Sequence, residues 1–418
     1  MSTVDKVTRR RFLTMSGVTA AGTLAAGATQ VNWMDLLTAA QRDPLAPGAG
    51  VLVVVTLYGG NDGLNTVIPA ADPAYQDARH ELAYQPEEVL DLGEGLGLNP
   101  GMAGMKKLWD ARKLAIVRGV GYPEPDHSHF RSMAIWQTAS PDRPATAGWL
   151  GRWLDATGDD PMRALSVEPT LPPLLAGERV AGASLPESGL RLPTGPLGEA
   201  FLALGAPQPG EAADAARAAR SIADLREAAR LLGEARARQD EEPPEDEERT
   251  KGASAGGRGA LGAQLDLVAT LIEAALPTRA YSVSLGGFDT HADERGTQQR
   301  LLTELDAALS GFVERMQRTD RGRAVVVLVY SEFGRRVRAN ASHGTDHGTA
   351  GPAFLLGERI RGGFHGRQPG LTDLVDGDLK ETTDFRDIYA TLLAGVLDAD
   401  AGRILADHPG RLDGVLAG

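Results

Sequence analysis

Val51-Leu-Val-Val-Val-Thr-Leu-Tyr58, which runs directly into Gly59-Gly60, is the stretch of this chain that decides the fold class. It is almost entirely apolar and rich in β-branched residues, so it lacks the alternation of a half-buried strand. A strand of this kind is buried on both faces, which is typical of a parallel sheet covered by helices. We therefore expect it to form a central strand of an α/β fold.

Further segments extend this pattern along the chain. Four more apolar runs predict strands at 113–119, 280–285, 323–330 and 352–356. Segments with helical spacing lie around them, at 101–112, 128–138, 149–157, 261–276, 296–318 and 384–397. Strands that alternate with helices predict a doubly wound sheet. The expected fold is a three-layer α/β/α sandwich with a mostly parallel sheet.

Composition narrows the function classes. The 418 residues include 56 acidic and 43 basic side chains, which gives a formal net charge of −13. An acidic chain lacks the cationic surface that a general nucleic-acid binder presents to phosphates, so we expect no nucleic-acid partner. The chain has no cysteine, which excludes disulfides, thiolate metal sites and cysteine nucleophiles. Any metal would be held by His, carboxylate, hydroxyl or backbone groups.

The first 28 residues resemble a twin-arginine export signal. Thr8-Arg-Arg-Arg-Phe-Leu13 precedes an uncharged stretch that ends at Ala26-Gly27-Ala28, which fits a signal peptidase site. An ordinary basic amphipathic N-terminus is the alternative. The stretch is too short and too weakly apolar for a comfortable membrane span. We expect a periplasmic or extracellular protein, exported by the twin-arginine machinery, with no stable membrane span in its mature form.

Residues 29–418 are expected to form one domain with an insertion at about 208–262. A strong helix-forming segment at 211–238 is followed by an acidic run at 240–248 and a Gly/Ser-rich run at 252–259. The acidic and glycine-rich tracts cannot bury a core, so we expect a surface excursion and not a second catalytic domain.

Potential metal ligands follow or precede the predicted strands. In open α/β sheets, ligands bind beyond the carboxyl ends of the strands. The polar side chains at these positions are Asp62, Asp289, His291, Glu332, His343 and His347. Each one alone could belong to a plain turn or a helix cap. Together, carboxylate and imidazole ligands without thiolate predict a divalent metal site, for Zn²⁺, Mn²⁺, Mg²⁺ or Ca²⁺.

A candidate nucleophile stands at the start of the 128–138 helix. Ser128, within Asp126-His-Ser-His129, would face free backbone N–H groups that suit a phosphate or sulfate oxygen. Metal coordination would lower the pKa of its hydroxyl. Arg131, one turn along, could bind two anionic oxygens. The alternative is that Asp126 or Ser128 is simply an N-cap.

Several of these motifs resemble those of a bacterial family of twin-arginine-exported proteins of unknown function, over nearly the whole chain outside 208–262. They are Gly59-Gly-Asn-Asp-Gly-Leu-Asn-Thr66, Ser128-His-Phe-Arg-Ser-Met-Ala-Ile-Trp-Gln-Thr138, Gly286-Gly-Phe-Asp-Thr-His291, Ser331-Glu-Phe-Gly-Arg335 and Asp346-His-Gly-Thr-Ala-Gly351. That family in turn resembles a remote branch of the alkaline phosphatase/sulfatase superfamily, which has an α/β/α metallohydrolase fold.

The resemblance implies a role for each matching residue. Asp62 resembles the metal aspartate after the first strand, and Ser128 resembles the metal-bound nucleophile, with Ser132 as its rival. The remaining metal ligands that it implies are Asp289, His291, Glu332 and His347.

Two departures from the superfamily pattern affect this expectation. Asp289 and His291 are two residues apart where four are usual, and Phe333 stands where a ligating histidine is expected. The consequence could be a single-metal site, a site that has lost its activity, or the recruitment of other ligands. The candidates for recruitment are His127, His129 and His343.

The leading hypothesis is an exported, metal-dependent hydrolase of small-molecule or envelope-linked phosphate or sulfate esters. Ser128 would attack, and Arg131, Arg335 and the metal would supply local positive charge for the anionic substrate. The alternative is a non-catalytic exported binding or assembly protein that keeps the fold and a degenerate site. A third hypothesis is transfer of a phosphate-linked group to an envelope glycan or lipid.

Overall fold

The computed structural model describes residues 29–30, 39–168, 171–185, 261–406 and 408–417 of the chain. The expected signal at 1–28 lies outside the described residues, as does the expected insertion up to residue 260.

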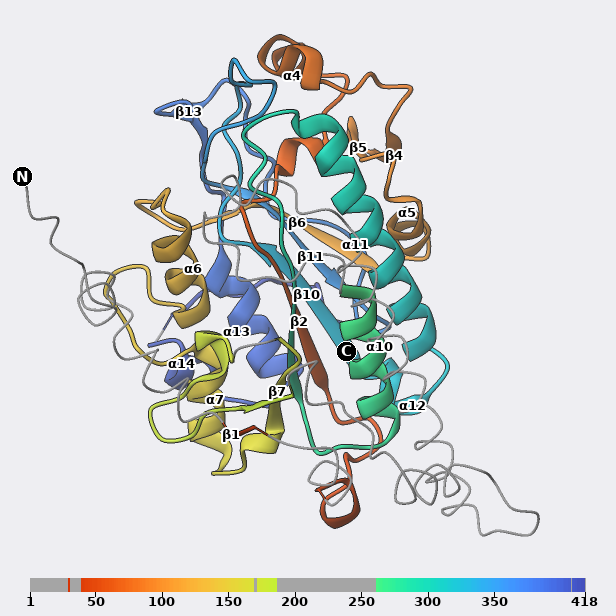
Figure 1. The fold of residues 1–418 in the computed structure, drawn as a ribbon, viewed down its shortest axis with the longest axis vertical. Coiled ribbons are helices and arrows are strands. Elements are labelled where there is room, and N and C mark those ends of the chain that lie inside the picture. The colour runs from red at the N-terminus through yellow and green to blue at the C-terminus, as the bar shows by residue number, and fades with distance from the viewer. Residues whose placement is uncertain (1–28, 31–38, 169–170, 186–260, 407, 418) are drawn as a thin grey trace, which may run out of the picture.

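A single large sheet forms the centre of the molecule (Figure 1). Within the described residues it has ten strands, and β15 (Thr383–Asp384) pairs with the end of β6 outside the main order. That order is β1 (Thr29–Gln30), β8 (Ala183–Ser184), β7 (Ala164–Ser166), β9 (Ala280–Leu285), β2 (Val51–Leu57), β10 (Val325–Ser331), β11 (Gly351–Leu356), β6 (Leu114–Gly121) and β12 (Gly363–His365). Strand β11 runs antiparallel to both of its neighbours, β10 and β6. The other pairs of described strands in this sheet are parallel, so the expected mostly parallel sheet is confirmed.

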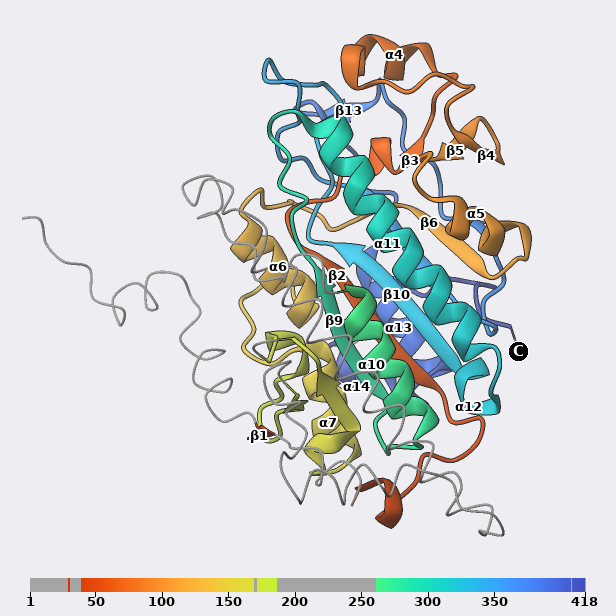
Figure 2. The ribbon, with the colours of Figure 1, turned by 45° about the vertical axis from the view of Figure 1, so that its right-hand side comes forward.

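Helices cover both faces of this sheet (Figures 1 and 2). One face carries α5 (Ala103–Asp110), α10 (Leu261–Glu273), α11 (Glu294–Met316) and the short α12 (Asp320–Arg323). The other face carries α6 (His129–Thr138), α7 (Trp149–Thr157), α13 (Phe385–Gly395) and α14 (Ala401–Ile404). The three-layer α/β/α sandwich predicted from the sequence is therefore confirmed.

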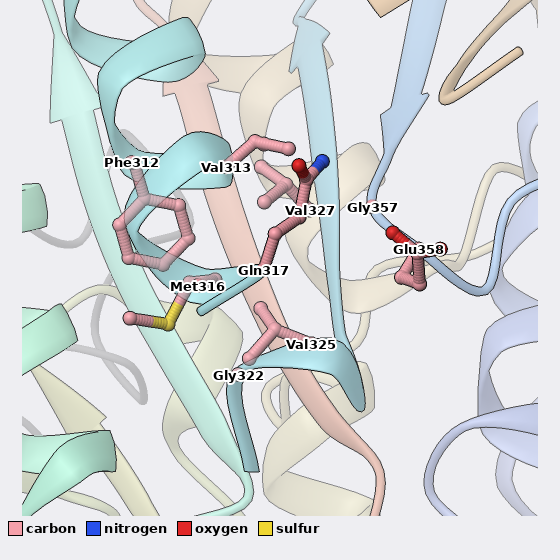
Figure 3. Close-up of a pocket in the computed structure, with 9 residues that line it drawn as sticks. All are labelled: Phe312, Val313, Met316, Gln317, Gly322, Val325, Val327, Gly357 and Glu358. Atoms are coloured by element: carbon pink, nitrogen blue, oxygen red, sulfur yellow. The ribbon is translucent and has the colours of Figure 1, made fainter. Parts of the chain in front are cut away.

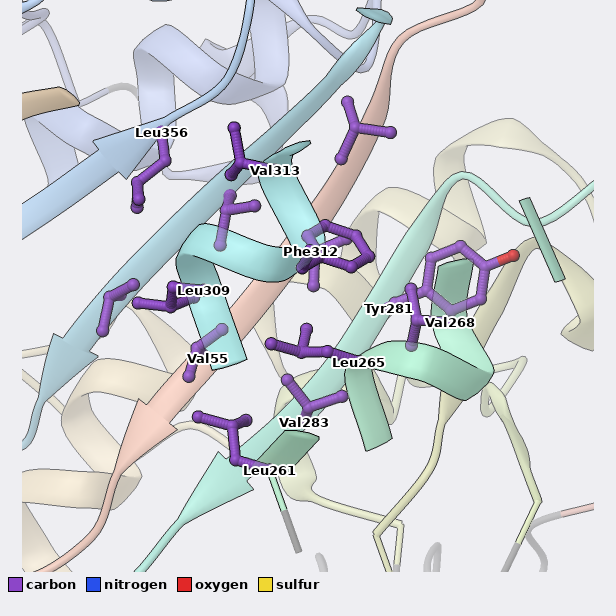
Figure 4. Close-up of a cluster of buried hydrophobic side chains, with 14 of the residues drawn as sticks. Val55, Leu261, Leu265, Val268, Tyr281, Val283, Leu309, Phe312, Val313 and Leu356 are labelled. Carbon is purple, nitrogen blue, oxygen red and sulfur yellow. The ribbon is translucent and has the colours of Figure 1, made fainter. Parts of the chain in front are cut away.

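The position of strand β2 at the centre of the sheet explains why its sequence is almost entirely apolar. Val51, Val53 and Val55 face one buried cluster, which α10 and α11 complete with Leu265 and Phe312 (Figure 4). The alternate residues, Leu52 and Val54, face a second cluster on the side of α6, α7 and α13. Because both faces of the strand are covered, neither set of side chains can be polar without a large cost in burial free energy.

Smaller elements surround this core. Val67–Ile68 (β3), Leu90–Gly93 (β4) and Leu96–Leu98 (β5) form a separate three-stranded sheet, and Pro73–Arg79 forms α4. Leu374–Val375 (β13) and Asp378–Leu379 (β14) form a hairpin. Short 3₁₀ turns span Gly63–Asn65, His80–Leu82, Pro161–Arg163 and Pro173–Leu175. Among the described helices, none has both the length and the apolar character that crossing a membrane requires.

The two ends of the sheet differ in chemistry. At the amino-terminal end of β10, a small hollow is lined mainly by apolar groups, including Phe312, Met316 and Val325 (Figure 3). Strands β2, β9 and β10 end at the opposite edge. The segment before β11 lies at that same edge because β11 runs in the opposite direction. The polar loops predicted from the sequence therefore meet at one edge of the sheet.

Candidate metal centre

The carboxylate of Asp289, in the loop after β9, lies at the centre of a cluster of cationic and imidazole groups. Its Oδ1 is 2.7 Å from Nη2 of Arg335 and 3.0 Å from Nε2 of His291. The same oxygen is 3.2 Å from Nε2 of His347 and 3.4 Å from Nε2 of His129. Three imidazoles, from the start of α6, the loop after β9 and the segment before β11, thus point the same ring atom at one oxygen.

Outer partners orient two of these rings. Nδ1 of His129, at the first position of α6, is 2.8 Å from Oε1 of Glu332. Nδ1 of His347 is 2.8 Å from the backbone oxygen of His127. A histidine whose Nδ1–H donates to a carboxylate or carbonyl keeps its lone pair on Nε2, the arrangement found in metal-ligating histidines. Both Nε2 atoms are therefore suited to act as ligands.

The third ring is held more loosely. Nδ1 of His291 is 3.5 Å from Oδ1 of Asp346, and its side chain is 44% exposed. Its Nε2 is 3.0 Å from Nε2 of His347. His291 therefore stands on the solvent side of the cluster.

The donor atoms fit a single divalent cation. Ligand atoms of His129, Asp289 and His347 all lie within 4.8 Å of one another. Four ligands at tetrahedral angles around Zn²⁺ would be separated by about 3.3 Å, close to the spacings around Asp289. Nε2 of His129 is buried and makes no hydrogen bond of ordinary geometry among the described residues, so after loss of its proton its lone pair would face the cluster. Imidazole donors favour Zn²⁺ and other transition metals over Mg²⁺ and Ca²⁺.

Electrostatics keep the central carboxylate ionised. Burial alone would raise the pKa of Asp289, but hydrogen bonds from His129, His347 and Arg335 hold it well below its usual range. Burial would also lower the pKa of His129, yet the carboxylates of Asp289 and Glu332 raise it to about 9. For His291, burial and the charge of Arg335 lower the pKa. Without a cation, His129 is therefore protonated near neutral pH. A cation would have to displace this proton in order to bind Nε2.

Arg335 has a structural role that the sequence did not indicate. We expected it to supply positive charge to an anionic substrate, but its guanidinium is fully buried. It donates to the carbonyl oxygens of Gly59, Gly60, Phe288 and Thr345 and to the carboxylate of Asp289. Arg335 therefore ties the loops together and orients Asp289, and it is not accessible to a substrate.

The structure does not bring Asp62 to this cluster. Its buried carboxylate pairs with Arg79 of α4, with Nη1–Oδ2 and Nη2–Oδ1 distances of 2.5 and 2.9 Å. Its Oδ1 also accepts from the backbone N–H of Leu64, which caps the short turn Gly63–Asn65. The Arg79 charge outweighs the effect of burial and lowers the pKa of Asp62. The turn alternative thus accounts for the local geometry of Asp62.

Glu332 and Phe333 lie beside the cluster in supporting positions. Oε1 of Glu332 accepts from the backbone N–H of Gly59 at 2.9 Å as well as facing His129, so this buried carboxylate fixes the ring and not the cation. The ring of Phe333 packs against the rings of His129 and His347, with both centroid separations at 4.8 Å. Phe333 therefore places an apolar ring at the position where a ligating histidine is usual in the superfamily.

The two candidate serines have different surroundings. Ser128 precedes α6 and is exposed, and its hydroxyl makes no capping hydrogen bond. Its backbone N–H donates to Oδ1 of Asp126 at 2.8 Å. Ser132 is fully buried, accepts from the hydroxyl of Tyr122 and donates to the backbone oxygen of Glu332. Ser128 is therefore the serine that a substrate can reach, directly beside His129.

Arg131 and the remaining histidines lie farther out. The side chain of Arg131 is 72% exposed and pairs with Asp126 at 2.9 Å. His343 pairs with Glu81 at the surface. Of the three histidines considered as recruited ligands, only His129 joins the described cluster. The Asp126-His-Ser-His129 run suggested a histidine ligand in the sequence. The position of His129 at the start of α6 determines that its ring, and not that of His127, points into the cluster.

The chain resembles one described protein family in sequence and several solved proteins in structure. Residues 211–416 match the model of a family described as "Protein of unknown function (DUF1501)". No curated protein matches the chain. The chain is similar in structure to a protein in the alkaline phosphatase superfamily from Vibrio parahaemolyticus, at 10% identity and a TM-score of 0.38 over 95% of this chain and 78% of that one.

Two other solved structures give similar values. The phosphonate monoester hydrolase from Silicibacter pomeroyi is 11% identical, with a TM-score of 0.37 over 86% of this chain and 77% of that one. A protein named Ps i-CgsB is 8% identical, with a TM-score of 0.36 over 87% and 75% of the two chains. Since all of these scores are below 0.5, no function is transferred from these proteins to this chain.

Proposed function

We propose that this chain is a metal-dependent hydrolase of phosphate or sulfate esters that uses one cation. His129, Asp289 and His347 would hold the cation, with His291 as a fourth donor on the solvent side. The observation that carries the proposal is the convergence of three Nε2 atoms on Asp289 Oδ1, one of them from His129, which directly follows the exposed Ser128 in the chain.

The chain's own residues divide the work. Ser128, at the N-terminus of α6, would be the nucleophile, where free backbone N–H groups favour an anionic oxygen. Glu332 fixes the ring of His129, and the carbonyl of His127 fixes the ring of His347. When bound, the cation would supply charge that stabilises the transferring group and favours the ionised hydroxyl. Zn²⁺ or Mn²⁺ suits the donor set better than Mg²⁺ or Ca²⁺.

Separate variants test the cation and the nucleophile. Purified mature protein is analysed for bound metal and assayed against aryl phosphate, phosphonate and sulfate esters. We expect about one metal ion per chain. His347→Ala is expected to lose both metal and turnover, and Ser128→Ala to lose turnover alone. Folded wild type that binds no divalent metal under any loading condition would overturn the proposal, and so would full activity in Ser128→Ala.

A second candidate function is a non-catalytic binding or assembly protein. It is favoured by the donor count, because His129, Asp289, His291 and His347 together would close a tetrahedral site, and closed sites are usually structural. The apolar ring of Phe333, which replaces a possible ligand beside the cluster, also favours a non-catalytic function. In that case metal would raise the melting temperature and no ester would be hydrolysed. His291→Ala would free one coordination position of the cation, but ester hydrolysis would still be absent.

Export to the periplasm or the cell exterior is part of the leading proposal. It depends on the Arg9-Arg10-Arg11 run and the neutral stretch after it. In either location the substrate would be an ester that is free in solution or linked to the cell envelope.

A further inference from the structure

The β13–β14 hairpin places a buried carboxylate beside the candidate metal centre. Asp378, the first residue of β14, has a side chain that is only 3% exposed. Its position is fixed by a two-residue turn, Asp376-Gly377, in which both residues have positive φ (52° and 91°), as a tight hairpin requires. Oδ2 of Asp378 is 2.9 Å from Nε2 of His127.

The same carboxylate holds an arginine. Oδ1 of Asp378 is 3.4 Å from Nε of Arg336, whose side chain is 43% exposed. This buried oxygen has no hydrogen-bond partner among the described residues, so its charge is directed at the guanidinium. Asp378 therefore lies between Arg336 and the segment that carries Ser128 and His129.

A second carboxylate connects Arg336 with the centre. The backbone N–H of Arg336 donates to the carbonyl of Asp346, whose side chain faces Nδ1 of His291. Arg336 thus lies between two acidic groups, of which Asp346 contacts His291 of the cluster and Asp378 contacts His127, whose backbone oxygen orients His347.

The guanidinium of Arg336 is available to a ligand. Its recorded partner within the described chain is Asp378, through Nε, which leaves Nη1 and Nη2 unpaired. Two parallel N–H groups match two oxygens of a phosphate or sulfate group. Arg335 is fully buried and so inaccessible, and Arg131 is paired with Asp126, whose side chain is 31% exposed, whereas the carboxylate that faces Arg336 is 3% exposed and therefore more firmly fixed.

We propose that Arg336 binds the non-bridging oxygens of the anionic ester and that Asp378 positions it. The proposal rests on the proposed function and names the residue by which the same site recognises an anionic group. Asp346 and Asp378 offset the charge of Arg336, so these three side chains have no net positive charge of their own. Anion binding therefore depends on Arg336 and the cation together.

Binding of inorganic phosphate tests this without requiring turnover. Phosphate is titrated calorimetrically into metal-loaded wild type and into Arg336→Gln, Arg336→Lys and Asp378→Asn. Loss of a charge-assisted, two-point contact is expected to weaken phosphate binding about ten- to a hundredfold in Arg336→Gln. Arg336→Lys is expected to recover only part of the affinity, because a single ammonium cannot form the fork. In the separate ester assay described under the proposed function, Asp378→Asn is expected to raise KM with less effect on kcat.

Controls separate this proposal from the proposed function. Arg318→Gln, an exposed arginine of an i,i+4 pair after α11, should bind phosphate like wild type. Metal content and melting temperature are measured for every variant. If Arg336→Gln fails to fold, Arg336→Lys serves for the comparison. Arg131→Gln is titrated in the same way. Wild-type phosphate affinity in a folded, metal-loaded Arg336 variant would refute the role of Arg336, as would a loss of affinity in Arg131→Gln alone. Absence of metal from wild type would instead refute the proposed function.

Discussion

Nδ1 of His347 lies 2.8 Å from the backbone oxygen of His127, although the two residues are 220 positions apart in the chain. This contact joins the segment before α6 to the segment before β11 and turns the Nε2 of His347 towards Asp289. A main-chain carbonyl thus determines which ring nitrogen faces the centre, and no side-chain substitution at residue 127 can remove it directly.

The central carboxylate offers the first prediction. Asp289→Asn keeps the shape of the side chain but removes its charge, so metal binding should fall by at least tenfold. Arg335 would also lose its charged partner while remaining buried, so the melting temperature should drop. Metal titration and thermal denaturation measure the two effects. His343→Ala, which removes an imidazole paired with Glu81 at the surface, is the matched control and should keep its metal.

Glu332→Gln tests the support of His129. The amide keeps the volume but no longer stabilises a positive charge on the ring, so metal affinity should fall about ten- to a hundredfold. The pKa of His129 should fall from its raised value of about 9, because one of the two carboxylates that raise it is removed. Nuclear magnetic resonance titration of the histidine rings in the metal-free variant measures this shift. An unchanged titration would show that Glu332 does not govern the ring.

The pH dependence of stability follows from the same histidine. The pKa of His129 in the folded protein, about 9, lies above its ordinary value of about 6.5. Its contribution to stability is therefore complete below the ordinary value and is lost as the pH rises through about 9. The melting temperature of the metal-free protein should fall between pH 7 and pH 10 by more than that of His129→Asn. Parallel profiles for the two proteins would contradict this assignment.

Gly60 provides a test of packing at the edge of the centre. It has φ of +71°, and a Cβ there would lie 2.3 Å from the ring of Phe333, which contacts two of the histidines. Gly60→Ala should be destabilising by about 2 to 4 kcal/mol, from backbone strain and crowding combined. Gly48, with φ of +79° and an open surrounding, is the matched control, and Gly48→Ala should show the strain alone. Chemical denaturation compares the two, and equal losses would show that crowding at Phe333 is absent.

Export has a simple test. Replacement of Arg9, Arg10 and Arg11 by Lys keeps the charge but removes the arginine pair that the export machinery would read. The full-length variant should stay in the cytoplasm with residues 1–28 attached, whereas the wild-type chain should be cleaved and exported. Fractionation followed by mass measurement of the N-terminus distinguishes the two. Equal export of both proteins would favour the alternative of an ordinary basic N-terminus.

The sequence predicted the layers of the fold well because burial on both faces leaves a clear pattern. The apolar run at 51–58 became β2, and the helical segment at 296–318 became α11 with its start two residues earlier. Strands β7 and β8, of three and two residues, carry too little pattern to be recognised. The expected roles of 1–28 and 208–260 remain predictions, since these residues lie outside the described chain.

The direction of β11 could not be predicted from its own residues. Its apolar run fits either orientation, and pairing with β10 and β6 decides that it is antiparallel. If β11 ran parallel to β10, the segment before it, which carries His347, would lie at the opposite end of the strands. The grouping of His347 with Asp289 thus depends on long-range pairing and not on local pattern.

Asp62 and Glu332 illustrate a second limit of sequence reasoning. The type and spacing of these residues suit metal ligands, but what each carboxylate does depends on its partner in space. Arg79 reaches Asp62 from α4, and His129 meets Glu332 from the start of α6. Neither partner belongs to the same local motif as its carboxylate. The motif could therefore suggest a metal ligand, but it could not show whether the carboxylate binds a cation or orients another side chain.

The donors of the centre lie on both sides of the long stretch at 186–260. His129 comes from the part of the chain before it, whereas Asp289 and His347 come from the part after it. Strands from both portions alternate in the one central sheet, so neither portion has a complete core without the other. A cation held by all three donors could therefore bind only after the early and late segments have paired, and its binding would report that this pairing is complete.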